Sequence, residues 1–100
     1  MKFNQEKFEI LRKVGKKPSY SKRELATELN ISVGKINYIL NELKKKGLVK
    51  ISNFKKNKNK TNYFYLLTPK GIANKSKLTI KFMKLKMQEY DELKKEINEE

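Results

Sequence analysis

The stretch SKRELATELNISVGKINYILNELKKKG, residues 21–47, decides the fold. Ser21 and Ser32 each stand where a helix is expected to begin, because an apolar residue precedes each serine and another follows four positions later. Glu24 completes a capping box with Ser21. Only two residues separate the expected helices, and one of them, Asn30, tolerates the left-handed conformation that a tight turn needs. The stretch therefore predicts a helix-turn-helix.

Apolar residues at helical spacing give these two helices a common core. Ala26 is a small residue at the point where the helix after Ser32 must cross the helix after Ser21 closely. The expected contacts between and beneath the helices come from Leu25, Leu29, Ile36, Ile39 and Leu40. In the helix that follows Ser32, the third in the chain, the spacing predicts one core-facing stripe, which consists of Val33, Ile36, Leu40 and Leu43. Gly47 follows at the position where a left-handed residue ends a helix.

Two more helices are expected outside this stretch. Asn4, between Phe3 and Phe8, predicts a first helix that runs to about Val14 and is ended by Gly15 and the proline after it. Thr68 and Pro69 mark the start of a last helix, since proline is well tolerated at the first helical position. No glycine or proline follows Gly71, so about thirty residues can form one helix of roughly 45 Å.

A β-hairpin is expected between the third and the last helix. Residues 49–52 alternate between apolar and polar types, and residues 63–67 are aromatic and β-prone. Residues 55–62 contain only Lys, Asn and Thr, so they hold no core anchor and predict an exposed loop. The expected fold is α+β and mostly helical: a winged helix-turn-helix with three helices and a two-stranded wing, followed by a long C-terminal helix.

The composition narrows the function. The 100 residues include 25 Lys and Arg against 11 Asp and Glu, a formal charge of +14, and neither Cys nor His. This excess favours a polyanionic partner. The absence of Cys and His removes the usual nucleophiles, general bases and metal ligands, so we expect no enzyme activity, no catalytic residue, no metal and no cofactor. No signal-like or membrane-spanning segment is evident, which indicates a cytoplasmic protein.

The outer face of the third helix carries groups that bind DNA. Gly34, Lys35, Asn37, Tyr38 and Asn41 lie opposite the core stripe. Amide, ammonium and phenol groups suit base edges or phosphates, so Lys35, Asn37, Tyr38 and Asn41 are the expected base contacts. An ordinary amphipathic helix with a merely polar outer face is the alternative. The helix-turn-helix and the lysine-rich wing favour DNA binding over it.

The phosphates of the DNA backbone are expected to contact helix N-termini and the wing. Free N–H groups at a helix N-terminus favour phosphate oxygens, and lysines supply affinity that depends on salt. The expected backbone contacts are Ser21, Ser32, Gly34, Lys55, Lys56, Lys58 and Lys60.

The last helix carries an apolar stripe that a domain of this size cannot cover. Leu78, Phe82 and Leu85 lie on one side of this helix. A second stripe follows a three-and-four spacing and continues into an acidic end. It predicts a homodimer interface that consists of Ile80, Met83, Met87, Tyr90, Leu93 and Ile97.

The sequence resembles the MarR-like winged-helix regulators. The similarity rests on the helix-turn-helix, on the Gly47-Leu48-Val49 segment and on residues 65–71, YLLTPKG. It is most similar to the exopolysaccharide (EPS)-associated MarR-family transcriptional regulators, through residues 31–38, ISVGKINY, and through the wing residues 53–60. This resemblance covers about residues 10–97.

The resemblance implies a dimeric transcription factor with its third helix in the major groove and its wing alongside. By position, Lys35, Asn37 and Tyr38 match the family's base-contacting residues. A small-molecule effector is not indicated, because the chain begins without the long N-terminal helix that forms much of the family's ligand pocket.

The leading hypothesis is a sequence-specific regulator that binds double-stranded DNA as a homodimer. Residues 1–68 are the expected DNA-binding domain, and residues 69–100 the expected dimerisation helix. A winged-helix module for protein interaction or RNA binding is the alternative, although such modules expose apolar groups where the third helix here is polar. A membrane partner is not expected, since no helix opposes cations to large apolar groups cleanly.

Overall fold

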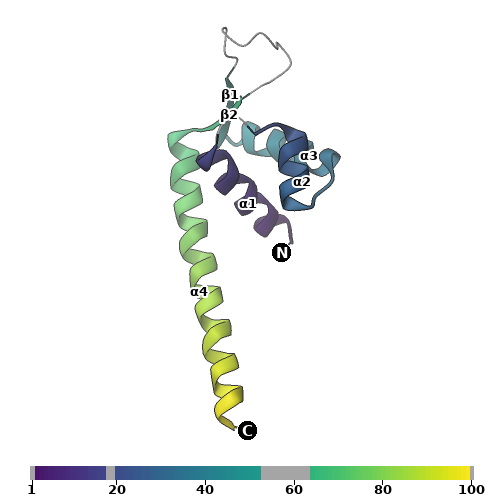
Figure 1. Ribbon diagram of the computed structural model, residues 1–100. Coiled ribbons are helices and arrows are strands. Elements are labelled where there is room, and N and C mark those ends of the chain that lie inside the picture. Colours follow the sequence, from purple (N-terminus) through teal and green to yellow (C-terminus); the bar gives the residue numbers. More distant parts are fainter. Residues whose placement is uncertain (1, 18–19, 53–63, 100) are drawn as a thin grey trace.

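The computed structural model describes residues 2–17, 20–52 and 64–99 (Figure 1). The elements, in chain order, are α1 (Lys2–Lys16), α2 (Lys22–Leu29), α3 (Val33–Lys45), β1 (Val49–Ser52), β2 (Phe64–Leu67) and α4 (Pro69–Glu99). The molecule is a mostly helical winged helix, as predicted. Helix α4, with 31 residues, is the longest element described and continues far beyond the other helices.

The helix-turn-helix forms through the predicted caps. The Ser21 hydroxyl accepts a hydrogen bond from the Glu24 N–H at 3.1 Å, and the Glu24 carboxylate accepts one from the Ser21 N–H at 3.3 Å. The Ser32 hydroxyl caps α3 through the Lys35 N–H at 3.2 Å. Asn30 takes the left-handed conformation with φ of 55°. These local bonds satisfy N–H groups that helix ends otherwise leave unpaired.

The core lies where α1, α2 and α3 meet β1 and β2. Its fully buried side chains are Ile10, Leu11, Val14, Leu25, Ile36, Ile39, Leu40 and Leu43. The predicted stripe of α3 was wrong at one end, since Val33 is 45% exposed. Val33 is the first residue of α3 and lies beyond the core, whereas Ile39 takes a fully buried place.

Helix α1 is longer than predicted at both ends. It begins at Lys2, so Asn4 lies inside the helix, and it runs through Gly15 to Lys16. The prediction that Gly15 ends the helix was therefore wrong. A Cβ at Gly15 would lie 3.1 Å from Leu67 Cδ1, so the glycine allows α1 to approach β2 closely. Gly15 thus leaves room for the Leu67 side chain, a contact that helical propensity alone does not reveal.

The wing is a two-stranded antiparallel sheet in which Val49 pairs with Leu67 and Ile51 with Tyr65. These four side chains share one face because residues alternate along a strand. Val49 and Tyr65 are buried and join the wing to the core. The predicted loop with Lys55, Lys56, Lys58 and Lys60 lies outside the described residues.

Hydrogen bonds and a close backbone contact join the start of α4 to the segment that follows α3. Gly47 ends the third helix in the predicted left-handed conformation, with φ of 73°. The Thr68 hydroxyl donates to the Gly47 carbonyl at 2.5 Å and accepts from the Gly71 N–H at 3.0 Å. The Thr68 N–H donates to the Leu48 carbonyl at 3.1 Å. A Cβ at Gly71 would lie only 1.9 Å from the same Leu48 oxygen, so the approach requires glycine.

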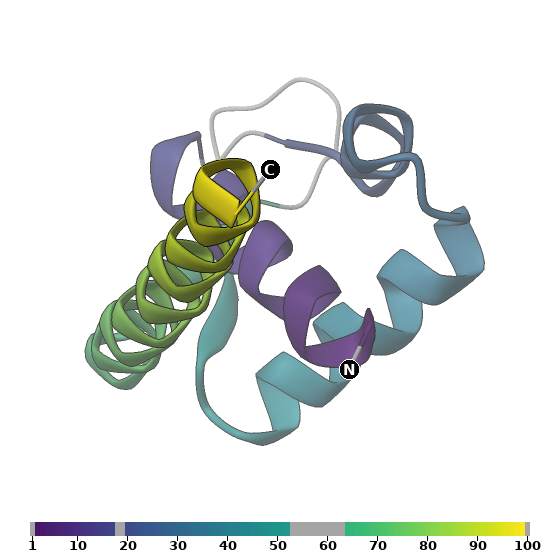
Figure 2. The same ribbon diagram turned by 90° about the horizontal axis from the view of Figure 1, so that it is seen from below.

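Only the first half of α4 packs on the domain. Leu78 lies against the core, and the ring of Phe82 stacks on Phe8 with centroids 4.8 Å apart. Leu85 lies on the same predicted side of the helix but is 45% exposed, so the buried part of that side ends at Phe82. Viewed from below, α1 lies between α4 and the α2–α3 pair (Figure 2). Among the described residues, no helix has the apolar length that crossing a bilayer requires.

We predict that Gly71→Ala destabilises the fold, because the added methyl group would overlap the Leu48 backbone. The expected loss in the free energy of unfolding is about 1–3 kcal/mol or more, the usual cost of overpacking. Urea unfolding followed by circular dichroism measures it. Gly34→Ala is the matched control, since no atom lies within 4 Å of a Cβ there. Equal stability of the two variants would contradict the role assigned to Gly71.

Candidate nucleic-acid interface

Helix α3 presents a polar outer face. Tyr38 is 59% exposed, and Gly34 and Asn41 are exposed beside it. The opposite side of the helix is buried through Ile36 and its neighbours, so core packing alone decides which side faces outward. Three of the predicted DNA contacts therefore share one open surface.

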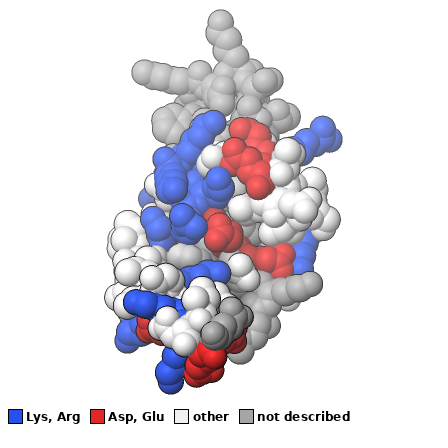
Figure 3. Space-filling view, turned by 60° about the horizontal axis from the view of Figure 1, so that its bottom comes forward, with Lys and Arg blue, Asp and Glu red and all other residues white. Residues whose placement is uncertain are grey.

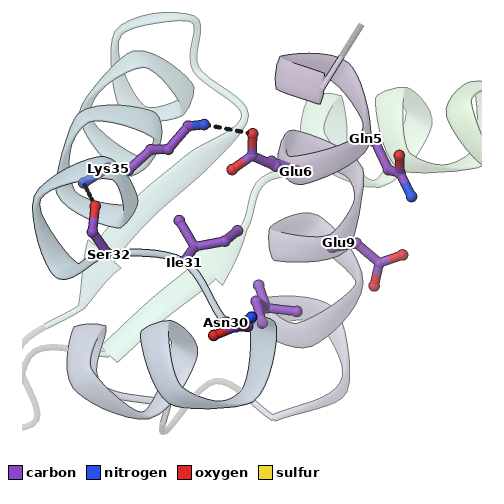
Figure 4. A pocket seen from close by; sticks show the side chains of 8 residues that line it. Gln5, Glu6, Glu9, Asn30, Ile31, Ser32 and Lys35 are labelled. Carbon is purple, nitrogen blue, oxygen red and sulfur yellow. Dashed lines mark hydrogen bonds and ion pairs between the residues drawn. The ribbon is translucent and has the colours of Figure 1, made fainter.

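Lys35 lies at the edge of this face and points toward α1 (Figure 4). Its Nζ lies 2.8 Å from Oε1 of Glu6, whose side chain is only 16% exposed. The ion pair joins the first turn of α3 to the first half of α1. Lys35 therefore contacts a DNA phosphate or base only by sharing its charge with Glu6 or by leaving it.

Asn37 lies on the opposite edge of α3 and is half-buried. Its Oδ1 accepts a hydrogen bond of 2.5 Å from Nζ of Lys22, the first residue of α2. The lysine thus orients the amide from a second helix. The sequence analysis did not single out Lys22. The available signal was its place at the start of α2, since the helix-turn-helix brings that end over α3.

Helix α2 is tied to α1 by charge. Nζ of Lys13 lies 3.3 Å from Oε2 of Glu28. A hydrogen bond from Tyr20, reinforced by the Lys13 charge, lowers the pKa of Glu28, and the same bond raises the pKa of Tyr20. These contacts hold α2, and with it Lys22, in a defined place relative to the rest of the domain.

Ser21 and Ser32 serve as helix caps in this structure. Their hydroxyl groups already accept backbone hydrogen bonds, so any phosphate contact there would use the hydroxyl proton or the N–H groups of the first turn. A shallow pocket of about 450 Å³ opens beside Ser32, between α1 and the turn that joins α2 to α3 (Figure 4). Glu6, Glu9 and Lys35 line it, which makes it polar and charged.

Basic and acidic side chains occupy different parts of the surface. On the face shown in Figure 3, Lys and Arg side chains gather mainly on one side, and the acidic side chains form separate groups. At the end of α3, Lys44, Lys45 and Lys46 are exposed next to the polar face. The described residues contain no cluster of three acidic side chains that could hold a metal ion.

The predicted dimer stripe of α4 lies open. Its six side chains, Ile80, Met83, Met87, Tyr90, Leu93 and Ile97, are 55–70% exposed. A groove of about 470 Å³ runs beside the stripe, between α1 and α4. Phe8 and Phe82 line the groove with Met83 and Met87, so the stripe continues into an apolar depression.

Sequence comparison identifies the class of domain. Residues 5–50, from α1 to the first residues of β1, match the family model described as winged helix-turn-helix DNA-binding. A search of curated proteins finds no match.

Solved structures share the fold. BldR, a transcriptional regulator from Sulfolobus solfataricus, matches with a TM-score of 0.78 and 22% identity over 87% of this chain and 60% of that one. Staphylococcus aureus MarR in complex with salicylate and kanamycin matches with a TM-score of 0.68 and 22% identity, covering 86% of this chain and 56% of the other. Streptococcus pneumoniae FabT in complex with DNA matches with a TM-score of 0.64 and 21% identity, covering 92% of this chain and 59% of the other.

The chain spans 60% or less of the length of each of these three proteins. At such identities the likeness concerns the fold. The protein is a winged helix, and its residues 5–50 carry the helix-turn-helix pattern of DNA-binding domains.

Proposed function

We propose that this protein is a transcriptional regulator of the MarR type that binds double-stranded DNA as a homodimer. The observation that carries the proposal is the face of α3 on which Gly34, Tyr38 and Asn41 lie exposed. An α-helix fits the major groove, and these groups suit base edges and phosphates. The match of residues 5–50 to a DNA-binding family model supports the same function.

The other contacts in the proposal follow from position and charge. Lys35 and Asn37 reach bases from the edges of α3, and the N-terminal turns of α2 and α3 meet phosphates at Ser21 and Ser32. Lys55, Lys56, Lys58 and Lys60 of the wing lie on the backbone or in the minor groove, where they add affinity that falls with salt. FabT, which shares the fold, is known in complex with DNA.

The proposal places the protein in the EPS-associated group of MarR-family regulators. The support is the resemblance of residues 31–38 and of the asparagine- and lysine-rich wing to that group. It assigns residues 1–68 to DNA binding and residues 69–100 to dimerisation. The 55–70% exposure of the α4 stripe supports a dimer, because soluble monomers rarely leave so large an apolar surface open.

The function is tested by the binding of selected and random DNA duplexes, measured by fluorescence anisotropy over a range of salt. We expect Tyr38→Ala and Asn37→Ala to weaken binding to the selected site by about 1–3 kcal/mol, the usual cost of a lost base contact. Binding to random duplex should change little. Lys95→Ala, near the far end of α4, is the control. Equal losses on both duplexes, or tighter binding to single-stranded RNA, would contradict the proposal and favour the alternative of an RNA-binding module.

Lys22 is expected to affect selectivity through Asn37. Lys22→Met removes the hydrogen bond to the amide, and its net value of about 1 kcal/mol predicts a roughly fivefold fall in the preference for the selected duplex. Arg23→Met removes the same charge from the next position, whose side chain makes no hydrogen bond or ion pair with α3 among the described residues. If both variants lose the same selectivity, the effect is one of charge alone and the positioning role is wrong.

Dimerisation is expected to depend on the α4 stripe. The double variant Met87→Glu and Tyr90→Glu should be a folded monomer, since neither side chain contributes to the core. Its DNA affinity should fall sharply because the second half-site is lost. Light scattering gives the mass and circular dichroism the helix content. Leu85→Glu, exposed on another side of α4, should remain dimeric. A double variant that stays dimeric would place the interface elsewhere, with α1 as the next candidate.

A further inference from the structure

Helix α4 is divided sharply by charge. Residues 69–88 contain six lysines and no acidic residue, whereas residues 89–100 contain six acidic residues and two lysines. Because α4 is one continuous helix from Pro69 to Glu99, these halves form a basic and an acidic segment on a single rod. The apolar stripe crosses the boundary, from Ile80 to Ile97.

The stripe has the spacing of a coiled-coil seam. Ile80, Met83, Met87, Tyr90 and Ile97 follow steps of three and four residues, with Lys94 at the remaining position. A stripe with this period packs best against a second helix that lies nearly parallel to its axis, in either direction. The sequence pattern alone leaves that direction open, and the charges decide it.

We infer that two copies of α4 pair antiparallel, with the basic segment of each helix against the acidic segment of the other. This rests on the homodimer proposed above and adds its geometry. A parallel pair would align the two basic segments with each other and set Lys84 near Lys84 of the partner, where like charges repel. The antiparallel pair instead sets the C-terminal part of each basic segment beside the acidic segment of the other helix.

The charges beside the seam also select the register. With the two-fold axis between Gln88 and Glu89, Met87 packs on the partner's Tyr90 and Ile80 on the partner's Ile97. Lys84, at the edge of the seam, then faces the partner's Asp91. A shift of one heptad in one direction sets Lys84 against its own copy, and a shift in the other sets Asp91 against its own copy. Only the central register pairs opposite charges there.

The groove between α1 and α4 accommodates this partner. Residues 79–87 line its α4 side, and in the central register they lie opposite residues 90–98 of the partner helix. The guanidinium of Arg12 lies 5.6 Å from the centroid of the Phe8 ring and pairs with Glu9 at 3.4 Å, and both side chains line the groove beside its apolar residues. Lys86 lines the same groove. Leu93 and Ile97 of the partner helix suit the apolar residues of the groove, and the acidic side chains of that helix suit Lys86, which leaves the groove with a net positive charge.

The absence of cysteine allows a direct test, because each introduced thiol is the only one in its chain. A disulfide needs Cβ atoms about 3.5–4.5 Å apart. The experiment mixes Ile80→Cys and Ile97→Cys proteins, allows subunit exchange and oxidises them. We expect a mixed disulfide and little disulfide from either variant alone, since like positions lie about 25 Å apart along an antiparallel pair.

Efficient self-disulfides of each variant alone would show a parallel pair and overturn the inference. A dimer by light scattering with neither product would overturn the register, and a monomer would overturn the interface. DNA binding is measured on the same samples. An antiparallel dimer without DNA selectivity would contradict the proposed function and leave this inference standing.

A charge reversal tests the electrostatic cause. Lys84→Glu should weaken the dimer at least several-fold in sedimentation experiments at low salt, and adding Asp91→Lys to it should restore most of the loss. Lys81→Glu makes the same charge change on the side of α4 away from the stripe, and it should have a smaller effect. If the double variant is weaker than Lys84→Glu alone, the pairing of Lys84 with Asp91 is wrong.

Discussion

The close contact between Gly71 and the Leu48 carbonyl is the constraint on which the arrangement of this molecule depends. It is made only because position 71 has no side chain, and Thr68 reinforces it by bonding Gly47 and Leu48 at once. The contact joins the end of α3, the base of the wing and the start of α4 at one point. The direction in which α4 leaves the domain, and hence the place of its exposed stripe, follows from this junction.

Helix α3 is positioned by two kinds of interaction. Its back is held by apolar burial, which decides the outward face but leaves the edges free to adjust. The edges are held by polar contacts from different helices, Glu6 of α1 to Lys35 and Lys22 of α2 to Asn37. The contact from Lys22 orients the Asn37 amide before DNA arrives, whereas the ion pair with Glu6 holds Lys35 toward α1. Preorganisation of this kind reduces the entropy that binding must cost.

The two halves of helix α4 differ in burial. Its first half packs on the core through Leu78 and Phe82, whereas the described residues of its second half are all exposed and carry most of the apolar stripe. The change from basic to acidic charge falls close to this boundary. The basic half is thus bound to a basic domain, and the acidic half extends away from it, available to a second copy.

The sequence by itself determined the elements and their order. Caps at Ser21, Ser32 and Thr68 and the left-handed positions Asn30 and Gly47 are local signals, because each depends on residues within one turn, and the structure confirms them. The polar composition of the outer α3 face and the spacing of the α4 stripe are periodic signals of the same kind. They predicted which residues share a surface.

The tertiary structure decided what depends on residues far apart in the chain. Gly15 looked like a helix end, but the proximity of Leu67 makes it a packing site inside α1. Val33 fits the apolar stripe of α3, yet it lies beyond the end of the core that it was expected to face. The partners of Lys35 and Asn37 come from α1 and α2, at separations no local pattern encodes. Helical periodicity tells which side of a helix is apolar, whereas the extent of burial is set only when the other elements pack against it.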